Sequence, residues 1–248
     1  PRPPPPPFRC ETVRAMLGEP LKPFREATRA VAPERFVEID GQCVHATRTG
    51  RGRPLLLLHG LAASHYSFRR LVPLLEDGFE VITIDLNGFG LTERPRREEN
   101  YRPGHQAGLV ARVLDTFGVG ECDVLGHSYG ACIASTLAKQ RSFRVGRLVF
   151  VSPASAFDPL PWYLRVAPGK ELSYRLVRLF LSDPRRYRRV AGRAFHVEGS
   201  FNEEDAEVYR SHLLIEGLRS TWYGFLRSMR DPDFPGSAYE GLDHPVLV

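Results

Sequence analysis

The sequence has few cysteines, no long apolar run and no leader-like beginning, and each shortage excludes a class of protein. Its four cysteines (Cys10, Cys43, Cys122, Cys132) show neither a C-x-x-C pair nor the spacing of a zinc site. We therefore expect no disulfide framework, no metal and a reducing, cytoplasmic location. The longest aliphatic stretch, Leu55 to Leu58, is far below the roughly 20 residues of a membrane span. Because the sequence opens on a proline run, we do not expect a signal peptide in it.

Lysine is also scarce, because only three of the 34 basic residues are lysines and the other 31 are arginines. The 29 acidic residues leave a net charge of +5, too small for 248 residues to indicate a nucleic-acid partner. With 42% apolar and 10% aromatic residues, the chain can bury one core. Residues 1–35 are expected to form a proline-rich tail and lead-in before that core.

Strand and helix patterns alternate along much of the chain. The expected strands are Phe36–Ile39, Cys43–Thr47, Leu55–Leu58, Glu80–Leu86, Cys122–Leu125, Arg147–Val151 and Pro245–Val248. The expected helices are Tyr66–Leu75, Gly104–Phe117 and Tyr129–Lys139. Asp40-Gly41 is a hairpin turn, and Thr49–Gly52 is a second turn. The pattern predicts an α/β protein whose mainly parallel sheet has helices on both faces and binds ligands beyond the carboxyl ends of its strands.

The alternation stops after Ser152. Residues 153–243 are rich in arginine and aromatics and are helical in pattern, most clearly over Leu172–Leu181 and Glu203–Leu218. A stretch of this length is too long for a plain loop. We expect it to be a helical cap inserted into an α/β core formed by residues 36–152 and 244–248.

The sharpest motif is Gly126-His127-Ser128-Tyr129-Gly130, which lies between an apolar strand and a helix. A nucleophilic serine needs a strained strand-to-helix turn, and small residues two places before and after it let the backbone fold that tightly. The amino end of the following helix points N–H groups at any oxyanion that forms there. The alternative is an ordinary turn with an N-capping serine.

A second motif, His59-Gly60-Leu61, follows the Leu55–Leu58 strand. If this strand is the neighbour of the one before Ser128, the backbone N–H groups of Leu61 and Tyr129 can both donate to one oxyanion. The alternative is that His59 merely caps the strand. We do not expect His59 to be a general base.

Together with Asp85-Leu86-Asn87-Gly88-Phe89-Gly90-Leu91-Thr92 and Pro245-Val246-Leu247-Val248, these motifs resemble the α/β-hydrolase fold family in its cap-bearing serine esterase branch. The resemblance implies Ser128 as nucleophile, with the N–H groups of Leu61 and Tyr129 as the oxyanion hole. Serine at this place departs from the epoxide hydrolases and haloalkane dehalogenases of the same fold, which use aspartate.

By the same resemblance, the catalytic acid and then the histidine follow the strand that begins at Pro245. We therefore expect a fragment that lacks the family's last strand and helix and has little hydrolase activity as given. Asp158 is an alternative acid.

Other polar residues are interpreted as structural or surface residues. Asp85 and the glycines after it are interpreted as a structural turn rather than a phosphate loop, because no lysine follows. Four of the histidines outside the motifs are interpreted as scattered surface or packing residues: His65, His105, His196 and His212. The run Arg185–Arg189 is interpreted as a solvated face, with contact to a membrane surface or an anionic substrate as the alternative.

The sequence thus predicts a serine hydrolase that cleaves a carboxylester or similar acyl bond through an acyl-enzyme on Ser128, without a cofactor. The apolar and aromatic residues of the expected cap favour a small acyl or ring-bearing substrate: Phe157, Trp162, Tyr163, Leu176, Leu179, Phe180, Trp222, Tyr223 and Phe225. Carbon–carbon bond hydrolysis and perhydrolysis with the same nucleophile remain open, as does a non-enzymatic binding protein on the same scaffold.

Overall fold

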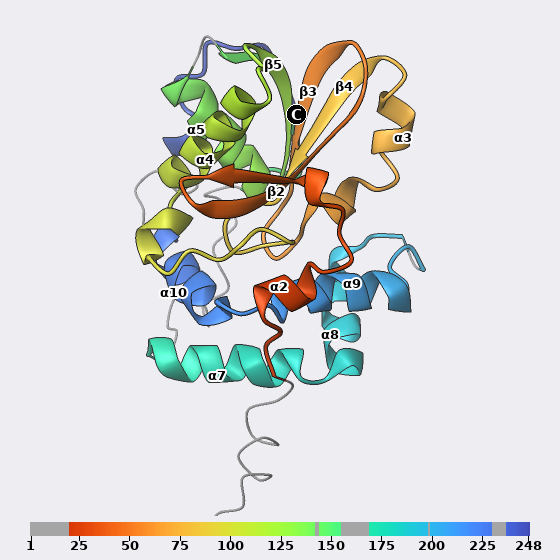
Figure 1. The fold of residues 1–248 in the computed structure, drawn as a ribbon, viewed down its shortest axis with the longest axis vertical. Helices are drawn as coiled ribbons and strands as arrows, with labels where there is room; N and C mark the ends of the chain where they lie inside the picture. The colour runs from red at the N-terminus through yellow and green to blue at the C-terminus, as the bar shows by residue number, and fades with distance from the viewer. Residues whose placement is uncertain (1–19, 142–143, 155–168, 198, 230–236) are drawn as a thin grey trace, which may run out of the picture.

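The computed structural model describes residues 20–141, 144–154, 169–197, 199–229 and 237–248. Its centre is a seven-stranded sheet of order β1-β2-β4-β3-β5-β6-β7 (Figure 1). The strands are β1 (Phe36–Ile39), β2 (Gln42–Gly50), β3 (Arg53–Leu58), β4 (Phe79–Ile84), β5 (Cys122–His127), β6 (Val145–Val151) and β7 (Val246–Leu247). The pairs β1–β2 and β2–β4 are antiparallel, and the other four pairs are parallel. The predicted α/β class with a mainly parallel sheet is confirmed.

The leucine run of β3 forms the middle of the sheet and packs on both of its faces. Leu56 and Leu58 belong to the larger apolar cluster, whereas Leu55 and Leu57 pack with Phe68 on the other face. This is the period of two that a strand imposes on its side chains. A strand buried on both faces explains why the run is continuously apolar.

The β1–β2 hairpin has the predicted turn. Asp40 and Gly41 have φ values of 52° and 77°, as a two-residue type I′ turn requires. The turn expected at Thr49–Gly52 begins later, because β2 continues to Gly50, where it still pairs with Glu80 of β4.

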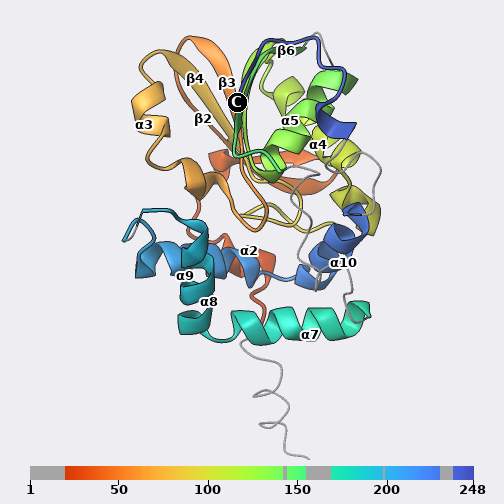
Figure 2. The same ribbon diagram turned by 180° about the vertical axis from the view of Figure 1, so that it is seen from behind.

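Helices cover both faces of the sheet, as Figures 1 and 2 show. On one side lie α4 (Pro103–Thr116) and α5 (Tyr129–Gln140), close to their predicted limits. On the other lie the short η2 (His65–Phe68) and α3 (Val72–Leu75), so the prediction of one helix over Tyr66–Leu75 is wrong. Pro73 explains the break, because it has no N–H to donate and its ring is tolerated only in a first helical turn. It stands there in the first turn of α3.

A second group of helices lies beyond the carboxyl ends of the strands, with α2 (Phe24–Ala27) against it (Figures 1 and 2). Its helices are α7 (Lys170–Leu181), α8 (Pro184–Ala191), α9 (Glu203–Leu213) and α10 (Leu218–Ser228). They share an apolar cluster that includes Leu181, Tyr187, Phe201 and Tyr209. The assignment of this segment as a cap, with the domain limits given above, stays a prediction.

The helix expected over Glu203–Leu218 is two helices. Helix α9 ends at Leu213, and α10 starts after Gly217, which has a left-handed φ of 88°. A Cβ at Gly217 would lie 2.5 Å from Cβ of Arg94, so the turn needs glycine both for its dihedral angle and for its close approach to the core. Among the described residues, no helix has the length and apolar character to cross a bilayer.

Candidate active site

Ser128 lies at a strained turn between β5 and α5. Its φ of 51° and ψ of −116° are outside the regions that side-chain-bearing residues ordinarily occupy, at a cost on the order of 1–3 kcal/mol. Its N–H donates to the carbonyl of Val151 over 3.0 Å. Its own carbonyl accepts from the N–H groups of Ala131 and Ala154 at 3.0 and 3.2 Å. The turn is therefore held by both the following helix and the neighbouring strand.

The glycines on either side of Ser128 are required by close packing. A Cβ at Gly126 would lie 2.5 Å from Cα of Ala131, and one at Gly130 would lie 2.1 Å from the carbonyl oxygen of Leu58. Both distances are below any normal contact. The spacing seen in the sequence is thus the spacing at which β5 and α5 pack on each other and on the end of β3.

The second motif lies beside this turn. Strands β3 and β5 are neighbours with Leu58 paired to Gly126, so the residues that follow them meet. A Cβ at Gly60 would lie 3.2 Å from Cβ of Ser128 and 3.0 Å from Nδ1 of His127. Leu61 is 41% exposed at the start of the next loop. Tyr129 is the first residue of α5. The structure brings both predicted oxyanion donors to the same edge of the sheet, and their role stays a prediction.

His59 is fully buried and held by two hydrogen bonds. Its Nε2 accepts from the Leu86 N–H over 3.0 Å, and its Nδ1 lies 2.8 Å from the Gly60 carbonyl, to which it donates. Burial lowers the pKa of His59, and the nearby Asp85 carboxylate only partly offsets this effect. The neutral form of the ring is therefore favoured, and its two hydrogen bonds connect the loops after β3 and β4. The expectation that His59 is not a base stays a prediction.

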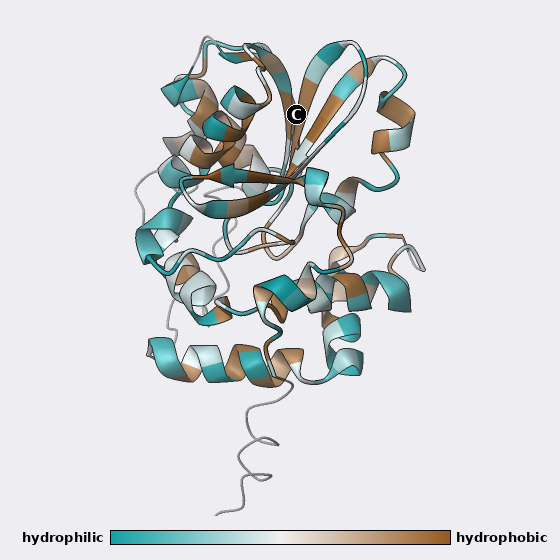
Figure 3. Cartoon of the chain, viewed as in Figure 1, coloured by the Kyte–Doolittle hydropathy of each residue, from teal (hydrophilic) through white to brown (hydrophobic). Residues whose placement is uncertain are grey.

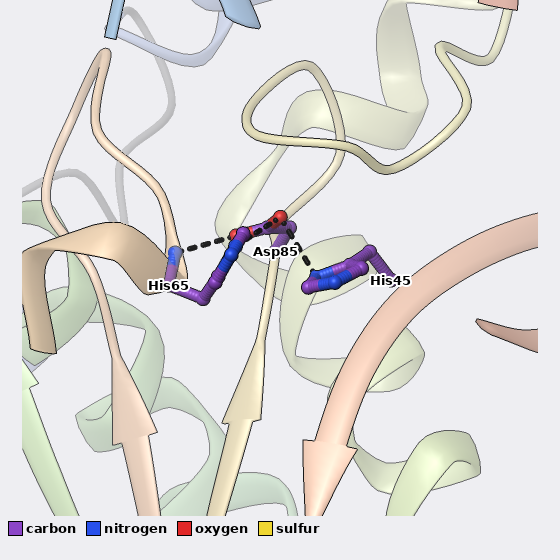
Figure 4. Close-up of side chains that lie close together, drawn as sticks. All are labelled: His45, His65 and Asp85. Atoms are coloured by element: carbon purple, nitrogen blue, oxygen red, sulfur yellow. Dashed lines mark hydrogen bonds and ion pairs between the residues drawn. The ribbon is translucent and has the colours of Figure 1, made fainter. Parts of the chain in front are cut away.

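Asp85, directly after β4, is the centre of a buried polar cluster (Figure 4). Its carboxylate accepts hydrogen bonds from the main-chain N–H groups of His65 and Leu91, at 2.6 and 2.9 Å, and from the His65 ring at 2.8 Å. Nδ1 of His45, on β2, lies 3.0 Å from the same carboxylate. A Cβ at Gly90 would overlap the carboxylate. These contacts agree with the interpretation of the segment as a structural turn.

Asp85 and His65 each favour the charged form of the other. Burial alone would raise the pKa of Asp85, but His65 and His45 outweigh burial and hold it well below its ordinary value. Burial likewise opposes charge on His65, and the attraction of Asp85 overcomes it and raises the His65 pKa. The ligand atoms of the three residues lie within 4.8 Å of one another, close enough to surround a cation. The hydrogen bonds to Asp85 account for this closeness without one.

The interpretation of His65 and His212 as scattered residues is wrong. His212, near the end of α9, stacks on His65 with ring centroids 6.0 Å apart, and its Nδ1 lies 3.1 Å from the hydroxyl oxygen of Ser64. The buried Arg94 guanidinium donates to the His212 carbonyl. One signal could have found part of this cluster. Asp85 and His65 follow neighbouring parallel strands, whose carboxyl ends share one edge of the sheet.

A groove of about 500 Å³ lies away from these motifs, between the β1–β2 turn and residues 93–100. Its walls are mostly polar and include Gln42, Asn87, Arg97 and Arg112. None of the residues 59–61 or 126–130 lines it. We therefore place the candidate active site at the Ser128 turn, where the strain and the close backbone approach occur. Asp158 and the aromatic residues Phe157, Trp162 and Tyr163 lie outside the described residues.

Residues 53–206 match the family model described as the alpha/beta hydrolase fold. The chain belongs to the α/β-hydrolase fold family. Epoxide hydrolase B of Mycobacterium tuberculosis is 33% identical over 156 residues, which are 55% of this chain and 44% of that protein. An uncharacterized hydrolase of Bacillus subtilis, YugF, is 34% identical over 125 residues, 49% of this chain and 45% of the other. The chain thus matches less than half the length of either relative.

Solved structures show the same α/β-hydrolase fold. The epoxide hydrolase CorEH matches with a TM-score of 0.71 and 24% identity, over 85% of this chain and 79% of its own. The epoxide hydrolase VrEH1 of Vigna radiata matches with a TM-score of 0.63 and 23% identity, over 77% and 71%. At this level of identity the likeness concerns the fold alone. The prediction of an α/β-hydrolase fold is therefore confirmed.

Proposed function

We propose that this α/β hydrolase is a serine hydrolase, and that Ser128 attacks a carboxylester or a similar acyl bond. The observation that carries the proposal is the backbone of Ser128, a serine in a strained conformation between β5 and α5. Strain of this kind persists only where the surroundings enforce it and is common at reactive residues. Here the surroundings are the backbone hydrogen bonds to Val151, Ala131 and Ala154.

The proposed reaction follows from this placement. The Ser128 oxygen attacks the acyl carbon and gives its proton to a general base. The carbonyl oxygen becomes an oxyanion that accepts from the N–H groups of Leu61 and Tyr129. One such donor is worth about 3 kcal/mol in the transition state. Collapse expels the alcohol, which takes the proton back from the base, and water then hydrolyses the acyl-enzyme.

The general base is assigned by the resemblance and not by a contact. In the family order the acid and then the histidine follow the strand that here is β7, so the resemblance assigns neither role to a described residue. His59, His65 and His212 are engaged around the loops after β3 and β4, so we do not assign the role to them.

Serine chemistry argues against epoxide opening, although several relatives are named epoxide hydrolases. A carboxylate that opens an epoxide forms an ester, which water can cleave at the carbonyl carbon. A serine oxygen that opens an epoxide forms an ether, which has no such carbon, and the enzyme would stop after one turnover. Ser128 therefore favours a substrate that brings its own carbonyl group.

We include the substrate class in the proposal. Several of the apolar and aromatic residues that suggested it have other roles in the structure. Leu176 and Leu179 are about half exposed on α7. Trp222 donates to the Ser173 hydroxyl, and Tyr223 donates to Glu171, so both join α10 to α7. Phe225 is buried. A small apolar acyl group is still the best expectation, because pockets bind chiefly by apolar burial.

A fluorophosphonate probe tests the nucleophile, because only an activated serine reacts with it. The protein is expressed from its complete reading frame as wild type, Ser128→Ala and Ser152→Ala. Ser152 is a matched control, since it is exposed, follows the neighbouring strand β6 and also has a positive φ, of 43°. We expect labelling and cleavage of p-nitrophenyl butyrate in the wild type and the Ser152 variant, with at least about a thousandfold loss in Ser128→Ala.

Each alternative gives a different result. Absence of labelling in a folded wild type favours a non-enzymatic binding protein. Turnover of styrene oxide that survives Ser128→Ala contradicts the proposal and points to another nucleophile. Equal labelling of the Ser128 and Ser152 variants contradicts it too.

A further inference from the structure

Residues 170–197, which form α7, α8 and the turn after them, combine exposed apolar side chains with clustered basic residues. Twelve large apolar side chains are exposed in the described part of the chain, and half of them belong to these 28 residues. They are Leu172, Leu176, Leu179, Val190, Phe195 and Val197. Helix α7 lies across the end of the molecule farthest from the sheet in both views of Figures 1 and 2. In Figure 3, hydrophobic and hydrophilic residues alternate along it.

The exposed leucines of α7 form one stripe. Leu172, Leu176 and Leu179 are spaced by four and three residues, which places them on one face of a helix. They are 52%, 52% and 46% exposed. The buried residues of α7, including Ser173 and Leu181, lie outside this stripe. The leucine stripe is therefore not the face by which α7 packs on its own chain.

The same segment holds all of the chain's excess positive charge. Residues 170–197 contain eight basic and two acidic residues, a net charge of +6, whereas the remaining residues sum to −1. Arg185, Arg186, Arg188 and Arg189 are all exposed on α8, which is anchored by the buried Tyr187.

The ion pairs of these arginines are long and exposed. Arg186 lies 3.9 Å from Asp183, and Arg188 lies 3.7 Å from Glu203. Such pairs contribute little and do not neutralise the surface.

We propose that residues 170–197 bind the surface of an anionic lipid membrane. An exposed apolar stripe and clustered arginines in one segment are the combination that rests at the boundary between acyl chains and headgroups, with the apolar side chains inserted and the cations on the phosphates. This inference does not depend on Ser128.

The charge and the composition argue against other occupants. A second copy of the chain would bring a surface of the same +6 charge against the first, at a cost in like-charge repulsion. A nucleic acid would satisfy the arginines but offers no apolar partner for three aliphatic leucines. A membrane satisfies both kinds of side chain at once.

Co-sedimentation with vesicles tests the proposal. One set of vesicles is phosphatidylcholine alone, and the other contains phosphatidylglycerol as well. We expect the chain to bind the second set, to bind the first at least about tenfold more weakly, and to be released by high salt. The release by salt needs no variant, so it tests the charge term even if a variant fails to fold.

Two variants separate the charge from the apolar stripe. Replacing Arg185, Arg186, Arg188 and Arg189 by serine removes four charges and should lower the partition coefficient about a hundredfold or more, since each charge near the surface is worth about 1 kcal/mol. Replacing Leu172, Leu176 and Leu179 by asparagine should lower it about tenfold or more.

The controls remove an equal charge, and about half as much exposed leucine surface, elsewhere on the protein. Arg51, Arg70, Arg97 and Arg147 are also exposed, and their replacement by serine should change binding less than about threefold. Leu74→Asn, at a side chain that is 79% exposed on α3, should not change it. Circular dichroism confirms that each variant is folded.

Several results would overturn the proposal. They are equal binding to both kinds of vesicle, an equal loss with the control arginines, and no binding at low salt. Tighter binding to a DNA duplex than to vesicles would assign the surface to nucleic acid. A dimer that the leucine variant dissociates would assign it to a second copy.

Discussion

Replacing His212 by glutamine should make the protein less sensitive to acid. The His212 ring lies between the core and α9, where its Nδ1 meets the Ser64 hydroxyl. Burial lowers the pKa of His212 to about 4; the attraction of Asp85 works against this shift, whereas His65 and Arg94 add to it. In the unfolded chain the ring titrates near its ordinary value of about 6.5.

The sign follows from proton binding. Below pH 6.5 or so the unfolded chain takes up a proton that the folded protein refuses, so stability falls as the pH falls. With pKa values of about 6.5 unfolded and about 4 folded, the loss is about 2 kcal/mol near pH 5 and close to zero near pH 7.5. Glutamine keeps an amide that can hydrogen-bond to Ser64 and does not titrate.

Chemical denaturation at the two pH values measures this difference. The wild type should lose about 2 kcal/mol more than His212→Gln between pH 7.5 and 5. His59 and His127, whose pKa values burial also lowers, contribute equally to both proteins and cancel in the comparison. His105→Gln, at an exposed position on α4, controls for the loss of any histidine. An equal loss in wild type and His212→Gln would refute the reasoning.

Two further predictions concern the same edge of the sheet. The pKa shift of His65 has the opposite sign to that of His212, because burial lowers the His65 pKa but Asp85 outweighs burial and raises it. The contribution of His65 to the free energy of unfolding is therefore full below about pH 6.5 and disappears as the pH rises through the raised pKa. His65→Gln should therefore cost more stability near pH 6 than near pH 9 in the same assay, and a greater cost at the higher pH would contradict this. Gly130→Ala should lower the free energy of unfolding by more than about 3 kcal/mol, because its Cβ would meet the Leu58 carbonyl at 2.1 Å. Gly120→Ala, where a Cβ would meet nothing within 4 Å, should change it by less than about 1 kcal/mol, and similar effects of the two would argue against a packing role for Gly130.

The sequence predicted best where a local rule and the tertiary structure require the same residue. The glycines around Ser128 signal a tight turn, and the apolar residues before and the helix after signal its setting. The structure requires glycine at 126 and 130 for contacts with Ala131 and Leu58. The strand over Leu55–Leu58 was also predicted correctly, because a strand buried on both faces has a continuous apolar run.

Prediction failed where one residue outweighs a periodic pattern. Over residues 66–75 the apolar spacing is helical, yet Pro73 breaks the segment into η2 and α3. Over residues 203–218, Gly217 and its contact with Arg94 separate α9 from α10. In both cases the apolar spacing does not specify whether one helix supplies the apolar positions, and over residues 66–75 it also places Leu74 on the buried face although that side chain is 79% exposed.

The histidine cluster could not be found from spacing along the chain. His45, His65 and His212 come from β2, η2 and α9, and only the sheet order and the docking of α9 bring them to Asp85 and to one another. A single-sequence argument can place Asp85 and His65 on one edge of the sheet. It has no means of placing a helix more than a hundred residues later against them.

This cluster also connects the candidate active site to the helices beyond the sheet. The loop that carries Gly60 past Ser128 continues to His65, whose main-chain N–H and ring both donate to Asp85. Helix α9 is attached to this loop region through His212, whose ring contacts the Ser64 hydroxyl and whose carbonyl accepts from Arg94. A buried carboxylate is tolerated only while its donors stay in position, because an unpaired buried charge costs several kcal/mol. Asp85 therefore fixes the loop that carries Leu61, the proposed oxyanion donor, without contacting Ser128. A shift of α9 would move that loop through the hydrogen bond between His212 and Ser64.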